Sequence, residues 1–150
     1  MNTGNDYIDG MLSIKNNYAV KNNINFEVII DEPFSSIKIR EDELISIISN
    51  LIDNAFEAFT KSDVGDNEIS ITTFKEDRNF CIEIADNGDI IPKNIIEKIF
   101  NRGFSTKVKR NDLHGFGLYI TKQLVEKNNG TISVESIPGK TKFLINFKME

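Results

Sequence analysis

The sequence predicts an α/β sandwich in which a mixed, mostly antiparallel sheet of about five strands packs on about three helices. Two observations predict this fold class. Apolar residues recur at helical spacing in three long segments, and they alternate with polar residues in five shorter ones, as half-buried strands require. The 150 residues are the usual size of a single domain and can bury a core without disulfides.

The residue pattern in the first part of the chain predicts two helices with a strand between them. Apolar side chains at helical spacing predict a helix over residues 6–19, and the polar stretch KNNIN after it indicates a linker. Alternation in NFEVIID predicts a strand over residues 25–31. Three acidic residues open the next apolar pattern, where a helix macrodipole favours negative charge, so we expect a helix over residues 41–61.

The residue pattern in the middle of the chain predicts a hairpin and a short helix. The runs EISITTF (68–74) and FCIEIAD (80–86) both alternate, and the polar connection between them is typical of a hairpin. Pro92 precedes a short helix in NIIEKIF, residues 94–100. Residues 101–117 are basic, rich in glycine and without periodicity, which predicts a long loop of the kind that is usually functional or mobile.

The C-terminal part completes the sandwich. We expect a helix from about Leu118 to Asn128, ended by Gly130 in the left-handed conformation that glycine adopts after helices. Two more strands, TISVES (131–136) and TKFLINF (141–147), flank a Pro-Gly turn.

Composition narrows the classes of function. The net charge of −5 argues against a nucleic-acid surface, although Arg102, Lys107, Lys109 and Arg110 form a local basic segment that is either a solvated loop or a phosphate contact. The single cysteine, Cys81, lies in an alternating strand, which favours a small core residue over a redox or metal role. No apolar run approaches the roughly 20 residues of a membrane-spanning helix.

The helix LISIISNLIDNAFEAF carries a polar stripe beside its apolar face. At about 100° per residue the stripe contains Asn50, Asp53, Asn54 and Glu57. Asparagine costs about 0.5 kcal/mol or more against alanine inside a helix, so two of them one turn apart suggest a function. Taken alone, the segment is more typical of an ordinary surface helix.

Two glycine-containing segments accompany this helix. The strand FCIEIA leads into Asp86-Asn87-Gly88, a common turn that also places a carboxylate at a strand end beside a residue that permits close backbone approach. Gly115 and Gly117 open the predicted C-terminal helix, where free N–H groups and the macrodipole favour an anion such as phosphate. An ordinary helix cap explains the second segment equally well when it is considered alone.

Taken in order, these segments resemble the GHKL superfamily of gyrase, heat-shock chaperone, histidine kinase and MutL ATPases, in its sensor-kinase branch. LISIISNLIDNAFEAF is similar to the N box, ADNGDIIP to the first glycine box, KIFNRGFSTK to the phenylalanine box and start of the ATP lid, and HGFGLYITKQLVEKNNGTISVES to the second glycine box. The match covers about residues 24–148 and looks closest to citrate and dicarboxylate sensor kinases, with peptide quorum-sensor kinases as near relatives. It implies a GHKL-type sandwich with a mobile ATP lid.

The resemblance implies a role for each matching residue. Asn54 is assigned to Mg²⁺, which usually takes only one or two protein ligands beside the nucleotide phosphates. Asn50 is assigned to the phosphate side, as the candidate catalytic residue. Asp86 is expected to accept a hydrogen bond from the adenine amino group, with support from Thr141. The other implied ATP-binding residues are Gly88, Arg102, Lys107, Gly115, Gly117 and Leu118.

Three positions depart from the pattern of the wider family. Ile90 replaces the second glycine of D-x-G-x-G; because a β-branched residue adopts positive φ with difficulty, we expect a changed local turn and weaker ATP binding. Asn50 replaces the glutamate base of the ATPase branches and cannot take a proton, which favours a kinase over a hydrolase. His114, the only histidine, lies in the second glycine box, so the phosphoacceptor is expected elsewhere.

The resemblance therefore implies a protein-histidine kinase catalytic domain, inactive alone, that transfers the γ-phosphoryl group of Mg-ATP to a histidine on a dimerisation domain outside this chain. By the family's domain order, residues 1–21 are expected to be the tail of the dimerisation helix and a linker, and residues 22–150 the ATP-binding domain. The expected partners are that dimerisation domain and a response regulator of two-component signalling, without nucleic acid. We expect this chain to be a soluble, cytoplasmic domain of a membrane-anchored parent.

Two other functions remain open on sequence grounds. A serine kinase of the anti-sigma type shares the fold, although the lid sequence fits that class less well. A nucleotide-free interaction module or phosphotransferase of the same fold is favoured by Ile90 and opposed by Asn54, Asp86 and the second glycine box.

Overall fold

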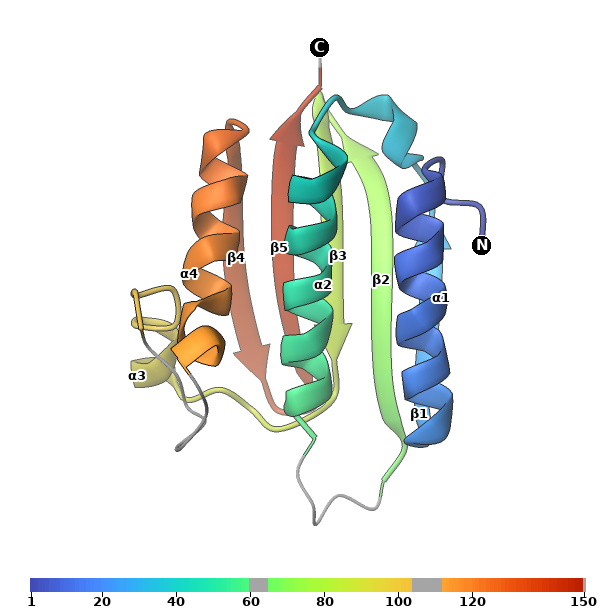
Figure 1. Cartoon of the computed structure of the whole chain (residues 1–150). Helices are drawn as coiled ribbons and strands as arrows, with labels where there is room; N and C mark the ends of the chain where they lie inside the picture. Colours follow the sequence, from blue (N-terminus) through green and yellow to red (C-terminus); the bar gives the residue numbers. More distant parts are fainter. Residues whose placement is uncertain (60–64, 104–111, 150) are drawn as a thin grey trace.

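Figure 1 shows the computed structural model of the chain, in which three long helices cover one face of a five-stranded sheet. The structure describes residues 1–59, 65–103 and 112–149, and of residues 112–116 it describes the backbone alone. In chain order the elements are α1 (Asp6–Lys21), β1 (Ile24–Ile30), the 3-10 helix η1 (Phe34–Ser36), α2 (Glu41–Glu57), β2 (Asn67–Glu76), β3 (Asn79–Asp86), α3 (Lys93–Ile96), α4 (Asp112–Lys127), β4 (Gly130–Ile137) and β5 (Lys140–Lys148).

The sheet is mixed, as the sequence predicts. Its strand order is β1-β2-β3-β5-β4, with β1 parallel to β2 and every other neighbouring pair antiparallel. Strand β3 ends with Asp86 at the end of the sheet where β5 begins, and the pairing of the two strands places Asp86 opposite Thr141. The C-terminal end of α2 lies at the same end of the sheet (Figure 1), so three segments distant in sequence meet at one end of the molecule.

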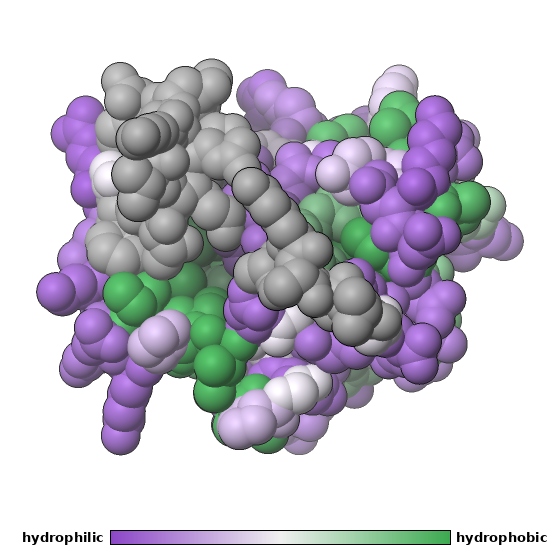
Figure 2. All heavy atoms as spheres, turned by 90° about the horizontal axis from the view of Figure 1, so that it is seen from below, coloured by the Kyte–Doolittle hydropathy of each residue, from purple (hydrophilic) through white to green (hydrophobic). Residues whose placement is uncertain are grey.

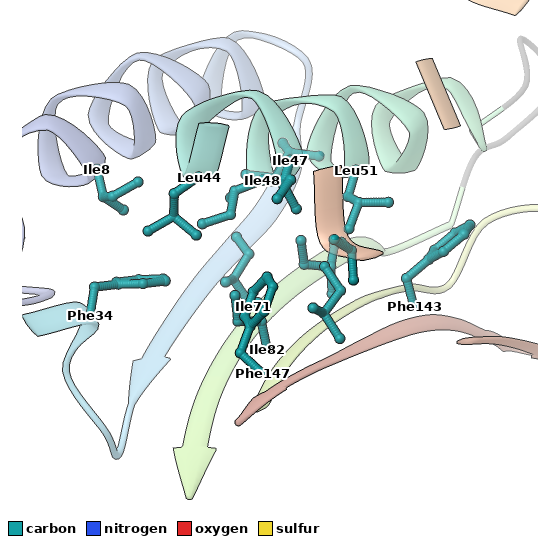
Figure 3. Close-up of a cluster of buried hydrophobic side chains, with 14 of the residues drawn as sticks. Ile8, Phe34, Leu44, Ile47, Ile48, Leu51, Ile71, Ile82, Phe143 and Phe147 are labelled. Carbon is teal, nitrogen blue, oxygen red and sulfur yellow. The ribbon is translucent and has the colours of Figure 1, made fainter. Parts of the chain in front are cut away.

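The hydrophobic core fills the space between the sheet and the helices. Figure 3 shows side chains of α2 pointing toward inward-facing side chains of the strands, among them Ile71, Ile82 and Phe147. Alternate strand residues join this core, which confirms the period of two predicted for the five strands. In burying large Ile, Leu and Phe side chains completely, the core gains about 1.5–3 kcal/mol for each.

Helix α1 is packed as a component of this sandwich. Ile8 and Leu12 are fully buried in the core, and the side chain of Asn5 caps the helix by accepting the N–H groups of Tyr7 and Ile8. The predicted helix over residues 6–19 is therefore present and slightly longer. A division at residue 21 between a dimerisation-helix tail and a catalytic domain stays a prediction.

Helix ends differ from those predicted in α2, α3 and α4: α3 ends at Ile96 rather than at residue 100, and the left-handed residue after α4 is Asn129 rather than Gly130. Helix α2 ends at Glu57 rather than at residue 61, because the chain leaves the helix at Ala58, whose carbonyl accepts the N–H of Asp89 at 2.9 Å. Helix α4 begins at Asp112 rather than at Leu118. Glycine costs about 1 kcal/mol in a helix interior, and packing of α4 on α2 and β4 offsets that cost, so the two glycines do not delay the helix.

Cys81 is buried, as predicted, and is a free thiol. It lies on the opposite face of the sheet from the helices, because its neighbours Phe80 and Ile82 are the residues of β3 that join the helix-covered core. Burial raises the pKa of this thiol, which favours the unreactive protonated form.

Within the described ranges no helix is long and apolar enough to cross a membrane.

Candidate functional site

Asp86 places a carboxylate in a buried position at the end of β3. Asp86 is only 6% exposed, and its Oδ1 accepts the N–H of Gly88 at 2.9 Å. Burial raises its pKa to about 6, the charge of Asp89 acts in the same direction, and the Gly88 N–H opposes both. Because Oδ2 accepts no hydrogen bond from the described residues, Asp86 has an acceptor available for a ligand N–H.

Gly88 is required by close packing between the turn after β3 and the end of α2. A Cβ at this position would lie 2.6 Å from the carbonyl oxygen of Ala58, closer than real contacts allow. The neighbouring Asp89 N–H donates to the same oxygen. This confirms the close backbone approach predicted for Gly88, and it fixes Asp86 relative to α2.

Asn87 ties the same turn to the start of β2. Its Oδ1 accepts the N–H of Glu68 at 2.7 Å, and its Nδ2 donates to the carbonyl of Asp66 at 2.6 Å. Both ends of the side-chain amide are thus used within the protein. This role of Asn87 was not predicted from the sequence, although an asparagine directly after a strand is a recurrent source of such side-chain to backbone bonds.

Thr141 lies beside Asp86, as predicted. It is 2% exposed on β5, and its hydroxyl is 2.5 Å from the hydroxyl of Ser136 on β4. The Ser136 oxygen also accepts the N–H of Ile91 at 2.8 Å, which holds the segment after Gly88 against β4. This role of Ser136 was not predicted from the sequence. The feature that could have indicated it is the inward position of Ser136 on β4, opposite Thr141, where the strand pattern calls for an apolar residue.

Asn50 and Asn54 lie on the flank of α2 that faces α4. The Nδ2 of Asn50 is 3.3 Å from Thr121 Oγ1 and 3.5 Å from the carbonyl oxygen of Gly117. Asn54, one turn later, is partly exposed and has no hydrogen bond from its side chain to any described residue. The two amides are therefore neighbours in the C-terminal half of α2, the end of which packs against the turn after Asp86.

Asp53 does not belong with these asparagines. Its Oδ1 accepts a hydrogen bond from Lys15 Nζ of α1 at 2.6 Å. The polar stripe predicted along α2 is in fact divided, because successive residues of a helix point 100° apart and α2 lies between α1 and α4. Asp53 faces the first neighbour, whereas Asn50 contacts the second.

The predicted glycine box lies inside α4 rather than before it. Gly115 is the fourth residue of the helix, so its N–H is among the four without a partner in the preceding turn. Gly117 is the sixth, beyond the N–H groups that a helix leaves free, and its carbonyl accepts the hydroxyl of Thr121. Leu118 packs against the hydrophobic core.

The remaining predicted residues lie at the margin of the described structure. Arg102 is exposed in the turn after α3, whereas Lys107 and the segment expected to form the lid lie outside the described residues. Ile90 is 49% exposed and is not among the described residues with positive φ, so the backbone at this position accommodates a β-branched side chain. The changed turn that we expected from Ile90 therefore involves no strained conformation.

The surface at this end of the molecule is mixed in character. Figure 2 views it from below Figure 1 and shows apolar surface gathered among polar side chains. Exposed Ile90 and Ile137 belong to segments at this end, after β3 and at the end of β4. A hollow beside this end of the sheet has Glu27, Ser70 and Lys140 in its lining together with Asp86 and Asn87, whereas Asn50 does not line it.

The fold and these side chains define a class of protein: a two-layer α/β domain with a buried carboxylate at a strand end and amide side chains on a covering helix. Residues 39–150 match the family described as Histidine kinase-, DNA gyrase B-, and HSP90-like ATPase. The chain belongs to this family. Membership of this ATPase family implies that it binds ATP.

Curated relatives are sensor kinases. The chain is 38% identical over 93 residues to sensor histidine kinase DpiB of Escherichia coli (strain K12), a match that covers 62% of this chain and 17% of the relative. It is 34% identical over 111 residues to a probable C4-dicarboxylate sensor kinase of Bacillus subtilis (strain 168), covering 73% of this chain and 20% of the relative. The matches thus span a fifth or less of the length of these relatives.

Solved structures confirm the fold. The catalytic domain of histidine kinase ThkA matches with a TM-score of 0.82 at 24% identity, over 98% of this chain and 93% of that chain. Another matching chain is that of ThkA in complex with the response regulator TrrA, with a TM-score of 0.77 at 23% identity, over 100% of this chain and 41% of that chain. The predicted α/β sandwich is therefore the fold of histidine kinase catalytic domains.

Proposed function

We propose that this chain binds Mg-ATP and is the catalytic domain of a sensor histidine kinase, which transfers the γ-phosphoryl group of ATP to a histidine on a dimerisation domain. The observation that supports this most directly is the buried Asp86, whose Oδ2 is available to accept a hydrogen bond beside Thr141. The family match and the sensor-kinase relatives support the kinase reading over other ATPase functions.

Adenine recognition is assigned to Asp86 and Thr141. A carboxylate that is largely removed from water gains more from a ligand N–H than an exposed one, because no water competes for the bond. The adenine amino group supplies such a donor. Gly88 contributes by bringing the turn against Ala58, which leaves Asp86 in a fixed position to receive it.

The phosphates and the cation are assigned to the other flank of the site. Asn54 presents an unengaged amide, and its oxygen is a hard ligand of the kind that Mg²⁺ prefers. Asn50, one turn earlier, is assigned to the phosphate side. Arg102, Lys107 and Gly115 remain the proposed phosphate contacts, whereas the N–H of Gly117 lies beyond those that the helix leaves free.

Magnesium would be held by few protein ligands. Within the described residues no group of three or more His, Cys, Asp or Glu side chains could hold a metal ion. A cation coordinated by amide oxygens of α2, nucleotide phosphates and water requires no such group. When bound, it neutralises charge on the phosphate oxygens; the residues of this chain bind and orient the nucleotide.

Phosphoryl transfer depends mainly on positioning and on neutralising charge, so the domain needs no nucleophile of its own. The position of Asn50 suits transfer rather than hydrolysis, because an amide cannot remove a proton from water. We propose the dimerisation domain of the parent protein as the source of the histidine and a response regulator as the next acceptor. The parent is then a membrane-anchored kinase, with this domain in the cytoplasm.

The alternative of a nucleotide-free module has less support than this proposal. The residue of the sequence that favoured such a module was Ile90, and Ile90 adopts an ordinary backbone conformation. The features that ATP binding would use, Asp86 with a free oxygen and the two amides of α2, are all present.

Isothermal titration of ATP and a non-hydrolysable analogue, with and without Mg²⁺, tests the proposal. We expect binding that Asp86→Asn abolishes and that Asn54→Ala makes insensitive to Mg²⁺. Asp53→Asn is the matched control, because it makes the same carboxylate-to-amide change on the flank of α2 that contacts Lys15. Absence of binding by the unmutated chain at millimolar ATP would favour the nucleotide-free module instead.

A further inference from the structure

The side-chain amide of Asn50 is held by two oxygen atoms of α4. Thr121 is fully buried, and its hydroxyl donates to the carbonyl oxygen of Gly117, one turn earlier, at 2.8 Å. Asn50 Nδ2 lies 3.3 Å from the Thr121 oxygen and 3.5 Å from that carbonyl oxygen. One nitrogen thus faces two acceptors.

This arrangement favours one orientation of the amide. The Gly117 carbonyl can only accept, and the one hydroxyl hydrogen of Thr121 donates to it. A reversed amide would place Asn50 Oδ1 against the Gly117 carbonyl oxygen, and it could bond to Thr121 only by taking the hydroxyl hydrogen away from that carbonyl. Nδ2 therefore faces α4, and Oδ1 is directed away from it with no donor among the described residues.

We propose that Thr121 is a positioning residue, whose hydroxyl fixes the amide of Asn50 so that Oδ1, and not Nδ2, is presented to the nucleotide-bound cation beside Asn54. This inference rests on the proposed function, since it specifies how the same site receives magnesium. Thr121 itself touches neither nucleotide nor cation. It acts in the way that partners of metal ligands commonly do, by setting the direction of the ligand atom.

The spacing of the two asparagines supports a joint role. Asn50 and Asn54 are separated by four residues, which places their side chains one above the other on one flank of α2. An amide that turned its NH₂ group toward the cation would repel it. Thr121 disfavours that orientation, whereas Asn54 has no comparable partner in the described structure.

The sequence alone did not reveal this residue. A threonine inside an apolar helical pattern is ordinarily explained by packing, or by a bond to the carbonyl four residues earlier, and Thr121 makes that bond as well. Only the approach of α2 to α4 in the folded chain brings its oxygen to Asn50, a contact between residues 71 positions apart.

The first test compares ATP affinity in Mg²⁺ and in EDTA for Thr121→Val, which keeps the shape of the side chain and removes the hydroxyl. We expect the gain in affinity that Mg²⁺ provides to fall 10- to 100-fold, the usual effect of losing a partner of a metal ligand, while affinity in EDTA is unchanged. Thr121→Ser, which keeps the hydroxyl, should restore the gain.

Thr73→Val is the matched control. Thr73 is also fully buried, and its hydroxyl donates to the carbonyl of Glu32 at 2.6 Å, away from α4. Thr73→Val should lower the stability of the protein without altering the effect of Mg²⁺ on ATP affinity. The proposal is overturned if Thr121→Val lowers affinity equally with and without Mg²⁺, or if Thr121→Ser behaves like Thr121→Val.

A second measurement needs no nucleotide. In the NMR spectrum of the unmutated chain, the side-chain NH₂ protons of Asn50, assigned by their loss in Asn50→Asp, should exchange slowly with water, and Thr121→Val should accelerate that exchange. Unchanged exchange in Thr121→Val would overturn the positioning role. If the unmutated chain binds no ATP, the proposed function and the cation contact both fall, and this measurement still decides whether Thr121 orients Asn50.

Discussion

Gly88 and Ala58 are packed so closely that a Cβ on Gly88 would lie 2.6 Å from the Ala58 carbonyl oxygen. Gly88→Ala should therefore lower the free energy of unfolding by about 1–3 kcal/mol, as overpacked substitutions do, and displace Asp86 from α2. Urea denaturation with ATP titration measures both effects.

Gly10→Ala is the control for that variant. Gly10 lies inside α1, and a Cβ there would meet no atom within 4 Å. It should raise the free energy of unfolding by about 0.5–1 kcal/mol, because alanine loses less backbone entropy in a helix. If Gly88→Ala were as stable as Gly10→Ala, the packing described for the turn would be wrong.

Asp86 should make the folded chain less stable at neutral pH than its amide variant. Its pKa in the folded chain is about 6, above the ordinary aspartate value of 3.8. Its contribution to stability is therefore most favourable below pH 3.8 and is lost as the pH rises through about 6. Asp86→Asn should gain up to about 3 kcal/mol at pH 7, from 1.36 kcal/mol for each unit of pKa. The stability difference between the two proteins, measured in urea from pH 4 to pH 7, should grow across that window; a constant difference would contradict it.

Nucleotide affinity should depend on the protonation of the same carboxylate. A protonated Asp86 is a poorer acceptor for the adenine amino group, so affinity should fall as pH decreases below about 6, the folded pKa. Adenosine is the appropriate ligand, since it has no ionisable phosphate to titrate in this range. Asp86→Asn, which has no such proton, should bind weakly at every pH, and an unmutated chain with a flat profile would count against Asp86 as the acceptor.

Glu43 joins the start of α2 to the end of α4 by accepting hydrogen bonds from Lys127 and Asn128. The Lys127 bond lowers the pKa of Glu43, so this contribution to stability is present above the ordinary glutamate value of 4.5 and is lost as the pH falls through the lowered pKa of the folded chain. Glu43→Gln should lower the melting temperature at pH 7 and cost less at acidic pH. Asp42→Asn, which breaks the fully exposed pair with Arg40, should change little at either pH; equal effects of the two substitutions would show that Glu43 makes no special contribution.

The sequence predicted the fold because its signals are local. Alternation in the five strands and the apolar pattern of α2 each identify an element, and acidic residues mark the beginning of α2 correctly at Glu41. The ends of helices were less accurate. Where α2 ends depends on the approach of Asp89 to Ala58, a tertiary contact that neither segment encodes alone.

The candidate site was predicted in part for the same reason. Asp86, Thr141, Asn50 and Asn54 were named from their motifs, and the fold places the first two in register and the last two on one flank of α2. Asp53 was grouped wrongly, because helical periodicity gives directions and not neighbours. Ser136 and Thr121 were missed because each becomes significant only through a partner from another element.

The bond between Glu43 and Lys127 fixes the C-terminal end of α4 to α2, whereas Gly117 lies ten residues away, or about 15 Å along the helix axis. A small rotation of α4 about that bond would leave Lys127 in place and shift Gly117 the most. The contacts that Asn50 makes with α4 are therefore more sensitive to the angle between the two helices than the contacts of Glu43 are.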